Sequence, residues 1–242
     1  MISIPEILQR AHESFNNKKY NEAIEYLNKV LEIDQANDAA HHTLGVIELK
    51  SGNALRATEH FLRAVEIKGN DPKYVYNYAA ALFELGRYSD SLKQFKRVLD
   101  LKPDYVPALN KCCVIVGMMG NVTLSERIAK SIIEKEPSFV EAYNNLGNAY
   151  KDQGKIEEAL ACYKKALELK PDFTTAASNL LLCLNYSRHD PQAVFEEHKQ
   201  WEKRLIPLSP SKPRSSPITL NDKKRIHKQR SLVCGFATLL FD

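Results

Sequence analysis

The sequence predicts an all-α protein, a right-handed superhelical solenoid of helical hairpins with a C-terminal capping helix. Two observations carry this prediction. A pattern of small, aromatic and proline residues recurs every 34 residues, and apolar residues within each copy recur at the i, i+3, i+4, i+7 spacing of amphipathic helices. The composition, 44% hydrophobic and 26% charged, is that of a globular protein.

The repeat is clearest in residues 144–172, NNLGNAYKDQGKIEEALACYKKALELKPD. Five copies follow one another without insertion, at residues 4–37, 38–71, 72–105, 106–139 and 140–173. The first small position holds in turn Ala11, Gly45, Ala79, Cys113 and Gly147, and the aromatic position holds Leu27, Phe61, Phe95, Ala129 and Tyr163. This period and pattern resemble the tetratricopeptide repeat, which implies a pair of antiparallel helices in each copy.

Each copy is predicted to fold as a helical hairpin. In the last copy the apolar face of the first helix is formed by Tyr143, Leu146, Gly147 and Tyr150, and that of the second by Ala159, Leu160, Tyr163, Ala166 and Leu167. Gly147 has no Cβ, which allows the two helices to approach closely. Pro171 cannot continue the second helix. Because one hairpin cannot bury both of its faces, successive hairpins are expected to stack.

Residues 174–205 are predicted to cap the array of repeats. The repeat pattern starts again at residue 174 and then departs from the earlier copies. Asp190 and Pro191 provide an N-cap and a first helical residue for an amphipathic helix that ends at Leu205.

Residues 206–242 are predicted to form a Pro/Ser-rich basic linker and tail that is poorly ordered. From Trp201 onward, nine Lys or Arg residues stand against three acidic residues. No aromatic side chain is interleaved with them before Phe236, so we favour a solvated linker over contact with nucleic acid or an acidic membrane surface.

The sequence at the junction between the repeats and the cap resembles a known family more specifically than the repeats themselves do. The run ACYKKALELKPDFTTAASNLLLCLNY, followed by DPQAVFEEHKQW, resembles the O-linked N-acetylglucosaminyltransferase family, including its bacterial members and its SPINDLY-like branch. Phe195, His198 and Trp201 have the spacing of the Phe, His and Trp that recur on the junction helix of that family. The resemblance covers residues 38–205 and implies that a catalytic half binding a nucleotide sugar should follow. Residues 206–242 do not match it, so we expect the chain to lack that half and not to be an enzyme.

The sixth position of each copy is expected to face the concave side of the superhelix. It is occupied by Gln9, Thr43, Asn77, Lys111 and Asn145, and by Asn179 in the cap. The family that the junction resembles lines its groove with Asn side chains that hold an extended peptide by its main chain, and Asn77, Asn145 and Asn179 stand at matching positions. An amide can donate and accept at once, which suits a peptide group.

The candidate peptide-binding groove consists of Asn77, Lys111, Asn144, Asn145, Asn148 and Asn179. The alternative is a solvated concave surface without a ligand. In either case, because the amides are expected on an exposed face, changing both Asn145 and Asn179 to Ala should hardly affect folding.

No constellation of residues predicts catalysis, a metal or a cofactor. The five cysteines, Cys112, Cys113, Cys162, Cys183 and Cys234, include no C-x-x-C pair and no His at zinc spacing, which favours packed, reduced thiols. For His41 and His42 we favour surface or packing roles over a ligand or catalyst. For His198 with Trp201 we favour a capping contact over catalysis. No glycine-rich phosphate loop follows a predicted strand.

These features predict a protein-interaction scaffold that binds extended peptide segments of protein partners. The alternative is the substrate-selecting part of a protein O-N-acetylglucosaminyltransferase whose catalytic half is truncated. The start of the chain has no signal-peptide pattern and no window is apolar enough for a membrane span, so we expect a cytoplasmic protein. The sequence is compatible with a homodimer and does not decide the oligomeric state. A nucleic-acid partner is not expected.

Overall fold

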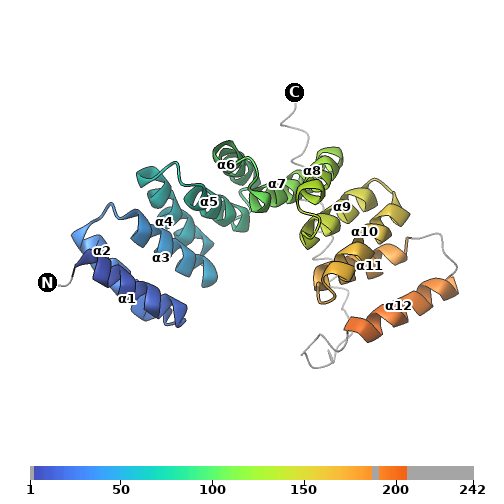
Figure 1. Cartoon of the computed structure of the whole chain (residues 1–242), viewed down its shortest axis with the longest axis horizontal. Coiled ribbons are helices and arrows are strands. Elements are labelled where there is room, and N and C mark those ends of the chain that lie inside the picture. Colours follow the sequence, from blue (N-terminus) through green and yellow to red (C-terminus); the bar gives the residue numbers. More distant parts are fainter. Residues whose placement is uncertain (1–2, 187–190, 206–242) are drawn as a thin grey trace. The chain divides into compact units, whose positions relative to one another are not determined.

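The computed structural model describes residues 3–186 and 191–205 of the chain, and these residues form helices joined by short turns (Figure 1). The helices in these ranges are α1 (Ile4–Asn16), α2 (Tyr20–Ile33), α3 (Asp38–Lys50), α4 (Ala54–Ile67), α5 (Pro72–Glu84), α6 (Tyr88–Leu101), α7 (Val106–Met118), α8 (Val122–Lys135), α9 (Val140–Asp152), α10 (Ile156–Leu169), α11 (Thr174–Leu184) and α12 (Pro191–Leu205). The prediction of an all-α fold of stacked helical hairpins is confirmed.

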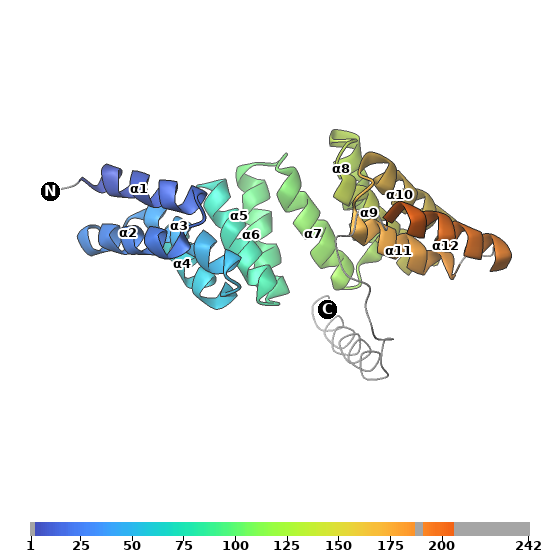
Figure 2. The same ribbon diagram turned by 90° about the horizontal axis from the view of Figure 1, so that it is seen from below.

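The helices follow the period of the sequence repeat. The first helices of the five hairpins begin at residues 4, 38, 72, 106 and 140, which are also the first residues of the five sequence copies. A turn of three residues separates each of them from its second helix. Figure 2 shows α1 lying beside α2, and α5 beside α6, in agreement with the contacts between these helices. Each copy is thus one helical hairpin.

The turn inside each hairpin contains one residue in the left-handed region. Gly52, Gly86, Gly120 and Gly154 have φ angles of 82°, 74°, 83° and 76°, which glycine adopts without the steric cost of a Cβ. Lys18 takes this place in the first hairpin, with a φ of 60°. The regular spacing of these glycines therefore reflects the geometry of the turn.

Side-chain caps help to define where two of the first helices begin. At the start of α3, Asn37 Oδ1 accepts a hydrogen bond from the Ala40 N–H at 3.0 Å. At the start of α5, Asp71 Oδ1 accepts one from the Lys73 N–H at 2.9 Å, and Pro72 occupies the first turn. These bonds satisfy backbone N–H groups that have no partner within the helix, so they stabilise the helix ends.

The chain divides into two compact units, Met1–Leu109 (unit 1) and Asn110–Asp242 (unit 2), with the boundary inside α7. In unit 1, a core around Ala11 and Leu27 is shared by α1, α2 and α3. In unit 2, a core around Tyr163 and Leu180 is shared by α10 and α11. Within each unit, apolar surface of one hairpin is therefore buried against the helix that follows it in the chain, as in other repeat proteins.

The two helices of a hairpin approach most closely where a glycine lies against an aromatic ring. A Cβ on Gly147 of α9 would lie 2.5 Å from Cε1 of Tyr163 on α10. A Cβ on Gly45 of α3 would lie 2.7 Å from Cδ1 of Phe61 on α4. Both rings are fully buried, so these small and aromatic residues have the packing role that the repeat pattern indicated.

The helix predicted to cap the repeats is α12. Trp201 packs against the core of α10 and α11, and Glu197 forms an ion pair with Lys164 of α10. The predicted N-cap Asp190 and the predicted linker and tail, residues 206–242, lie outside the described residues. Within the described part of the chain, none of the helices combines the length and the hydrophobicity that crossing a membrane requires.

Candidate functional site

Five asparagines on three first helices of unit 2 form two neighbouring sets of hydrogen bonds, which together we call the amide cluster. It consists of Asn110 on α7, Asn144, Asn145 and Asn148 on α9, and Asn179 on α11. Asn145 Nδ2 donates to Asn110 Oδ1 at 2.7 Å. Asn179 Nδ2 donates to Asn144 Oδ1 at 2.9 Å and to Asn148 Oδ1 at 3.2 Å. Because every one of these bonds joins two successive first helices, the amide cluster holds neighbouring hairpins in register.

The packing of the hairpin places Asn148 within the cluster. The hydroxyl of Tyr163 on α10 donates to Asn148 Oδ1 at 2.8 Å. Burial raises the pKa of Tyr163, so the phenol stays protonated and remains a donor at neutral pH. Gly147 leaves the space in which this ring lies. The small and aromatic residues of the repeat thus also orient a polar side chain of the candidate site.

The amides of this cluster are less exposed than the sequence suggested. Asn144 is 6% exposed and Asn145 9% exposed. The expectation that Asn145→Ala and Asn179→Ala leave folding unchanged must therefore be corrected. Each substitution removes a hydrogen bond between hairpins and leaves a buried or half-buried acceptor without its donor, which costs about 1–3 kcal/mol.

A cavity of about 280 Å³ opens beside the amide cluster. Its walls include Asn145, Asn148 and Asn179, together with Cys113, Val114, Gly117, Met118, Val122, Ser125, Ala149, Lys151 and Asp152. The Oδ1 atoms of Asn145 and Asn179 accept no hydrogen bond from any residue in the described ranges, and neither is among the fully enclosed polar atoms. Both oxygens can therefore accept a hydrogen bond from a ligand in the cavity.

The charges that line this cavity are balanced. Lys151 Nζ lies 3.4 Å from Asp152 Oδ1, so one cation and one anion face each other. Burial raises the pKa of the Cys113 thiol, which keeps it protonated and therefore weakly nucleophilic at neutral pH. The site offers neutral amide groups and a compensated ion pair, which suits an uncharged polar ligand such as a peptide main chain.

Asn77, the third predicted ladder residue, lies in unit 1 and makes a different contact. Its Nδ2 is 2.6 Å from Nε2 of His42, so it links α5 to α3. Because the amide donates, His42 Nε2 must be unprotonated. Burial, with a smaller contribution from the charge of Lys73, lowers the pKa of His42 to about 4, which keeps the imidazole neutral. His42 is buried and stacks on Tyr74, with ring centroids 4.5 Å apart.

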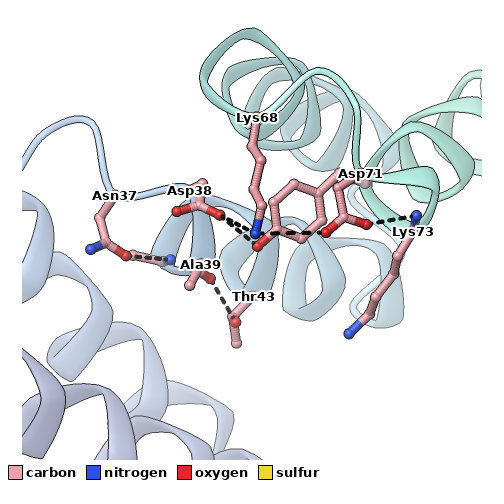
Figure 3. Close-up of polar contacts among 9 residues, drawn as sticks. Asn37, Asp38, Ala39, Thr43, Lys68, Asp71 and Lys73 are labelled. Carbon is pink, nitrogen blue, oxygen red and sulfur yellow. Dashed lines mark hydrogen bonds and ion pairs between the residues drawn. The ribbon is translucent and has the colours of Figure 1, made fainter.

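Charged groups reinforce the same link between α3 and α5 (Figure 3). Lys68 Nζ, in the turn before α5, lies 3.8 Å from an oxygen of Asp38 and 3.8 Å from an oxygen of Asp71. The Tyr74 hydroxyl donates to Asp38 Oδ2 at 2.9 Å. Burial and this hydrogen bond raise the pKa of Tyr74. These contacts join two hairpins of unit 1.

Gln9 and Thr43, two of the remaining sixth-position residues, lie outside the amide cluster. Gln9 Nε2 donates to Glu13 Oε1 at 3.0 Å and Thr43 Oγ1 donates to the Ala39 carbonyl at 2.8 Å, so both bond within their own helices (Figure 3 shows Thr43). Lys111 is half-buried on α7.

Sequence analysis missed the acceptors Asn110 and His42. Each stands at the fifth position of its copy, 35 residues before the Asn that donates to it. A polar residue at the fifth position of a copy is therefore the sequence feature that would have identified these two acceptors.

The predicted junction residues of α12 lie in three different environments. Phe195 is 52% exposed, with Lys199 Nζ 4.7 Å from its ring centroid. Trp201 packs against the core of α10 and α11. His198 is half-buried, and its Nε2 is enclosed without a hydrogen-bond partner among the described residues.

Comparison with protein families identifies the repeat. The tetratricopeptide repeat family matches residues 140–173, which is the fifth sequence copy. The family described as anaphase-promoting complex, cyclosome, subunit 3 matches residues 16–98.

Two curated relatives match part of the chain. Superkiller complex protein 3 of Mus musculus is 29% identical over 107 residues, covering 43% of this chain and 7% of the relative. Protein O-mannosyl-transferase TMTC3 of Homo sapiens is 30% identical over 110 residues, covering 45% of this chain and 12% of the relative. The chain thus aligns with only a small part of either relative, and the likeness is a distant one.

Solved structures share the fold at low sequence identity. PilW, described as a type IV pilus biogenesis factor, has a TM-score of 0.70 at 20% identity and covers 92% of this chain and 98% of its own. YrrB, described as a TPR protein with an unusual peptide-binding site, has a TM-score of 0.63 at 19% identity and covers 73% and 91%. The solved structures show a shared fold, and the match to residues 140–173 together with the helical hairpins identifies the repeats of this chain as tetratricopeptide repeats.

Proposed function

We propose that the chain is an interaction scaffold whose amide cluster in unit 2 binds the main chain of an extended peptide from a protein partner. The observation that carries this proposal is the pair of Oδ1 atoms of Asn145 and Asn179, which stand at the cavity without an internal donor in the described residues. The peptide-binding site named for YrrB, which has the same fold, supports it.

The hydrogen bonds between hairpins prepare the amides for this role. Asn145 and Asn179 each use Nδ2 to bond the preceding hairpin, so their side chains are held in one orientation before a ligand arrives. Preorganised groups lose less entropy on binding than mobile ones. Because a carbonyl oxygen accepts from any backbone N–H, recognition would depend weakly on the side chains of the peptide.

The first experiment compares two sets of Asn substitutions. Peptides are selected from a random phage-displayed library on the full chain, and their affinities are measured by fluorescence anisotropy. Asn145→Ala with Asn179→Ala should weaken binding about five- to a hundred-fold, because two hydrogen bonds of about 0.5–1.5 kcal/mol each are lost. Asn77→Ala, the matched control, removes an inter-hairpin bond of the same kind in unit 1 and should leave the affinity unchanged.

A second experiment tests whether the main chain is what is recognised. Replacing single side chains of a selected peptide by Ala should change the affinity little, whereas N-methylation of a backbone amide that reaches an Asn oxygen should weaken binding at least as much as the loss of one hydrogen bond. The reverse pattern, in which Ala substitutions abolish binding and N-methyl groups are tolerated, would show that the cavity recognises the side chains of the peptide. Equal affinities of wild type and the double Asn variant would place the peptide site elsewhere.

A second candidate function is the selection of substrates for a protein glycosyltransferase. It is favoured by the resemblance of the junction around Phe195, His198 and Trp201, and by the match to a relative named as an O-mannosyl-transferase. In this case the repeats would present acceptor polypeptides to a catalytic region encoded beyond residue 242 or on another chain. The coding sequence that follows residue 242 tests it: continuation into a hydrophobic strand and a His-Pro loop favours this function, and unrelated sequence favours the scaffold.

Under either function we propose that the 242-residue chain is not itself an enzyme. Calorimetric titration with uridine-diphosphate N-acetylglucosamine should then give no binding heat. Saturable binding at micromolar concentration would overturn this proposal.

A further inference from the structure

Two histidines of one hairpin in unit 1 face each other through their ring nitrogens. His41 lies on α3 and His60 on α4, and their Nδ1 atoms are 3.2 Å apart. The ring centroids are 5.6 Å apart and the ring planes differ by 38°. Both side chains are half-buried. The pair is therefore held by two packed helices while one side remains accessible.

The backbone fixes which nitrogen of His41 can act as a ligand. Its Nε2 lies 3.2 Å from the carbonyl oxygen of Gln35. A carbonyl can only accept, so His41 Nε2 carries the proton and Nδ1 presents a lone pair toward His60. Metal-binding histidines commonly donate their second ring N–H to such a carbonyl, which sets the tautomer and orients the ring.

The separation of the two nitrogens fits a shared metal ion. Zinc–imidazole bonds are about 2.0–2.1 Å long, and two of them at the tetrahedral angle place their nitrogens about 3.3 Å apart. His41 Nδ1 and His60 Nδ1, at 3.2 Å, already have nearly this separation. The distance therefore matches, and a bound ion would require both rings to turn until their Nδ1 lone pairs converge on it.

Solvent reaches the pair from the side of His41. A cavity of about 490 Å³ is lined by His41 with Gln35, Arg63 and Glu66, and His60 is not among its lining residues. Arg63 and Glu66 form an ion pair at 2.9 Å, so their charges offset each other. Water molecules can enter a cavity of this size on the His41 side.

We propose that His41 and His60 form an open site for a divalent transition-metal cation such as Zn²⁺, with both Nδ1 atoms as ligands. Imidazole suits Zn²⁺, Cu²⁺ and Ni²⁺. In the ranges that the structure describes, no group of three or more His, Cys, Asp or Glu side chains completes a metal site, so the other positions are filled by water or by a donor from a partner protein. When the metal binds, His60 moves its ring proton from Nδ1 to Nε2, and no net proton is released.

Calorimetric titration of the full chain with ZnCl₂ tests the proposal. We expect one saturable site that is lost or weakened at least about tenfold in His41→Ala and in His60→Ala, since removing even an indirect partner of a metal ligand costs 10–100-fold in affinity. His12→Ala is the matched control, because His12 is an exposed histidine on α1, and its zinc affinity should equal that of wild type. Helical spectra confirm that each variant is folded, and an Ala variant that is not folded is replaced by the Gln variant of the same residue.

Nuclear magnetic resonance of the imidazole nitrogens provides the second measurement. Zinc should shift the Nδ1 signals of His41 and His60 and convert His60 to the Nε2–H tautomer, while the signals of His42 stay in place. No saturable binding, or binding that survives both substitutions, would show that the two residues form only a hydrogen-bonded histidine pair.

Discussion

The hairpins α3/α4 of unit 1 and α9/α10 of unit 2 have the same apolar packing and different polar contacts. In each, a glycine of the first helix lies against a fully buried aromatic ring of the second, Gly45 against Phe61 and Gly147 against Tyr163. The Tyr163 hydroxyl donates to Asn148, whereas the Phe61 ring lies next to the imidazole of His42, with centroids 5.7 Å apart. The two hairpins therefore share the same contact between a glycine and a buried ring. The polar side chains next to this contact differ between them.

The largest effect is expected from removing either ring. Tyr163→Ala and Phe61→Ala should each lower the free energy of unfolding by about 3–5 kcal/mol, because both delete a fully buried aromatic side chain and leave a cavity. Urea unfolding followed by circular dichroism measures the loss. A cost of only about 1 kcal/mol at one site would show that this hairpin collapses around the gap, and the packing of the two hairpins would then not be equivalent.

Filling the glycine positions should have the next largest effect. Gly147→Ala and Gly45→Ala place a Cβ within 2.5 Å and 2.7 Å of ring atoms, so we expect each to destabilise the fold by about 1–3 kcal/mol despite the better helix propensity of Ala. In a background in which the ring is replaced by Leu, the same substitutions should cost less, with a coupling energy of about 0.5–3 kcal/mol. Additive effects would mean that the glycine and the ring do not restrict each other.

Substitutions that remove or add a tyrosine hydroxyl should have a smaller effect on stability, and this effect should differ between the two hairpins. Tyr163→Phe removes the bond to Asn148 and should cost about 0.5–1.5 kcal/mol. The residue of the second copy that corresponds to Asn148 is Val46, which packs against the core of Phe61. Phe61→Tyr should therefore be destabilising by itself and less so together with Val46→Asn. Urea unfolding of the single and double variants measures the coupling, and its absence would show that a side chain at position 46 cannot accept a hydrogen bond from a hydroxyl at position 61.

The last difference that we expect between the units is in their pH dependence. The pKa of His42 is lowered from 6.5 to about 4, so between these values the unfolded chain binds a proton that the folded chain excludes. The free energy of unfolding should then fall as the pH decreases from 6.5 to about 4 and level off below that. The side chains of the amide cluster do not titrate.

His42→Gln is the variant that isolates this dependence. Gln keeps a group that can accept from Asn77 and cannot take up a proton. Wild type should lose more stability than the variant when urea unfolding is repeated at several pH values across the window. Parallel curves for the two proteins would show that other groups cause the pH dependence.

Much of the fold was predictable because its signals are local. The glycines at Gly52, Gly86, Gly120 and Gly154 determine the hairpin turns, and the small and aromatic positions determine which helical faces meet. The candidate site was predictable in part. The sixth-position pattern identified Asn145 and Asn179, but it also included Asn77, which lies in the other unit, and it overlooked Asn110.

The sequence by itself determined the helical hairpins, since each depends on residues within one period of 34 and on packing that tolerates small shifts. Only the tertiary structure decided which polar atoms meet. The bond from Asn145 to Asn110 spans two hairpins, and the approach of His41 to His60 joins residues with no recognisable spacing. Hydrogen bonds and metal ligands depend on distances of a few tenths of an ångström and on the rotation of each helix, whereas periodicity defines only which face of a helix is buried.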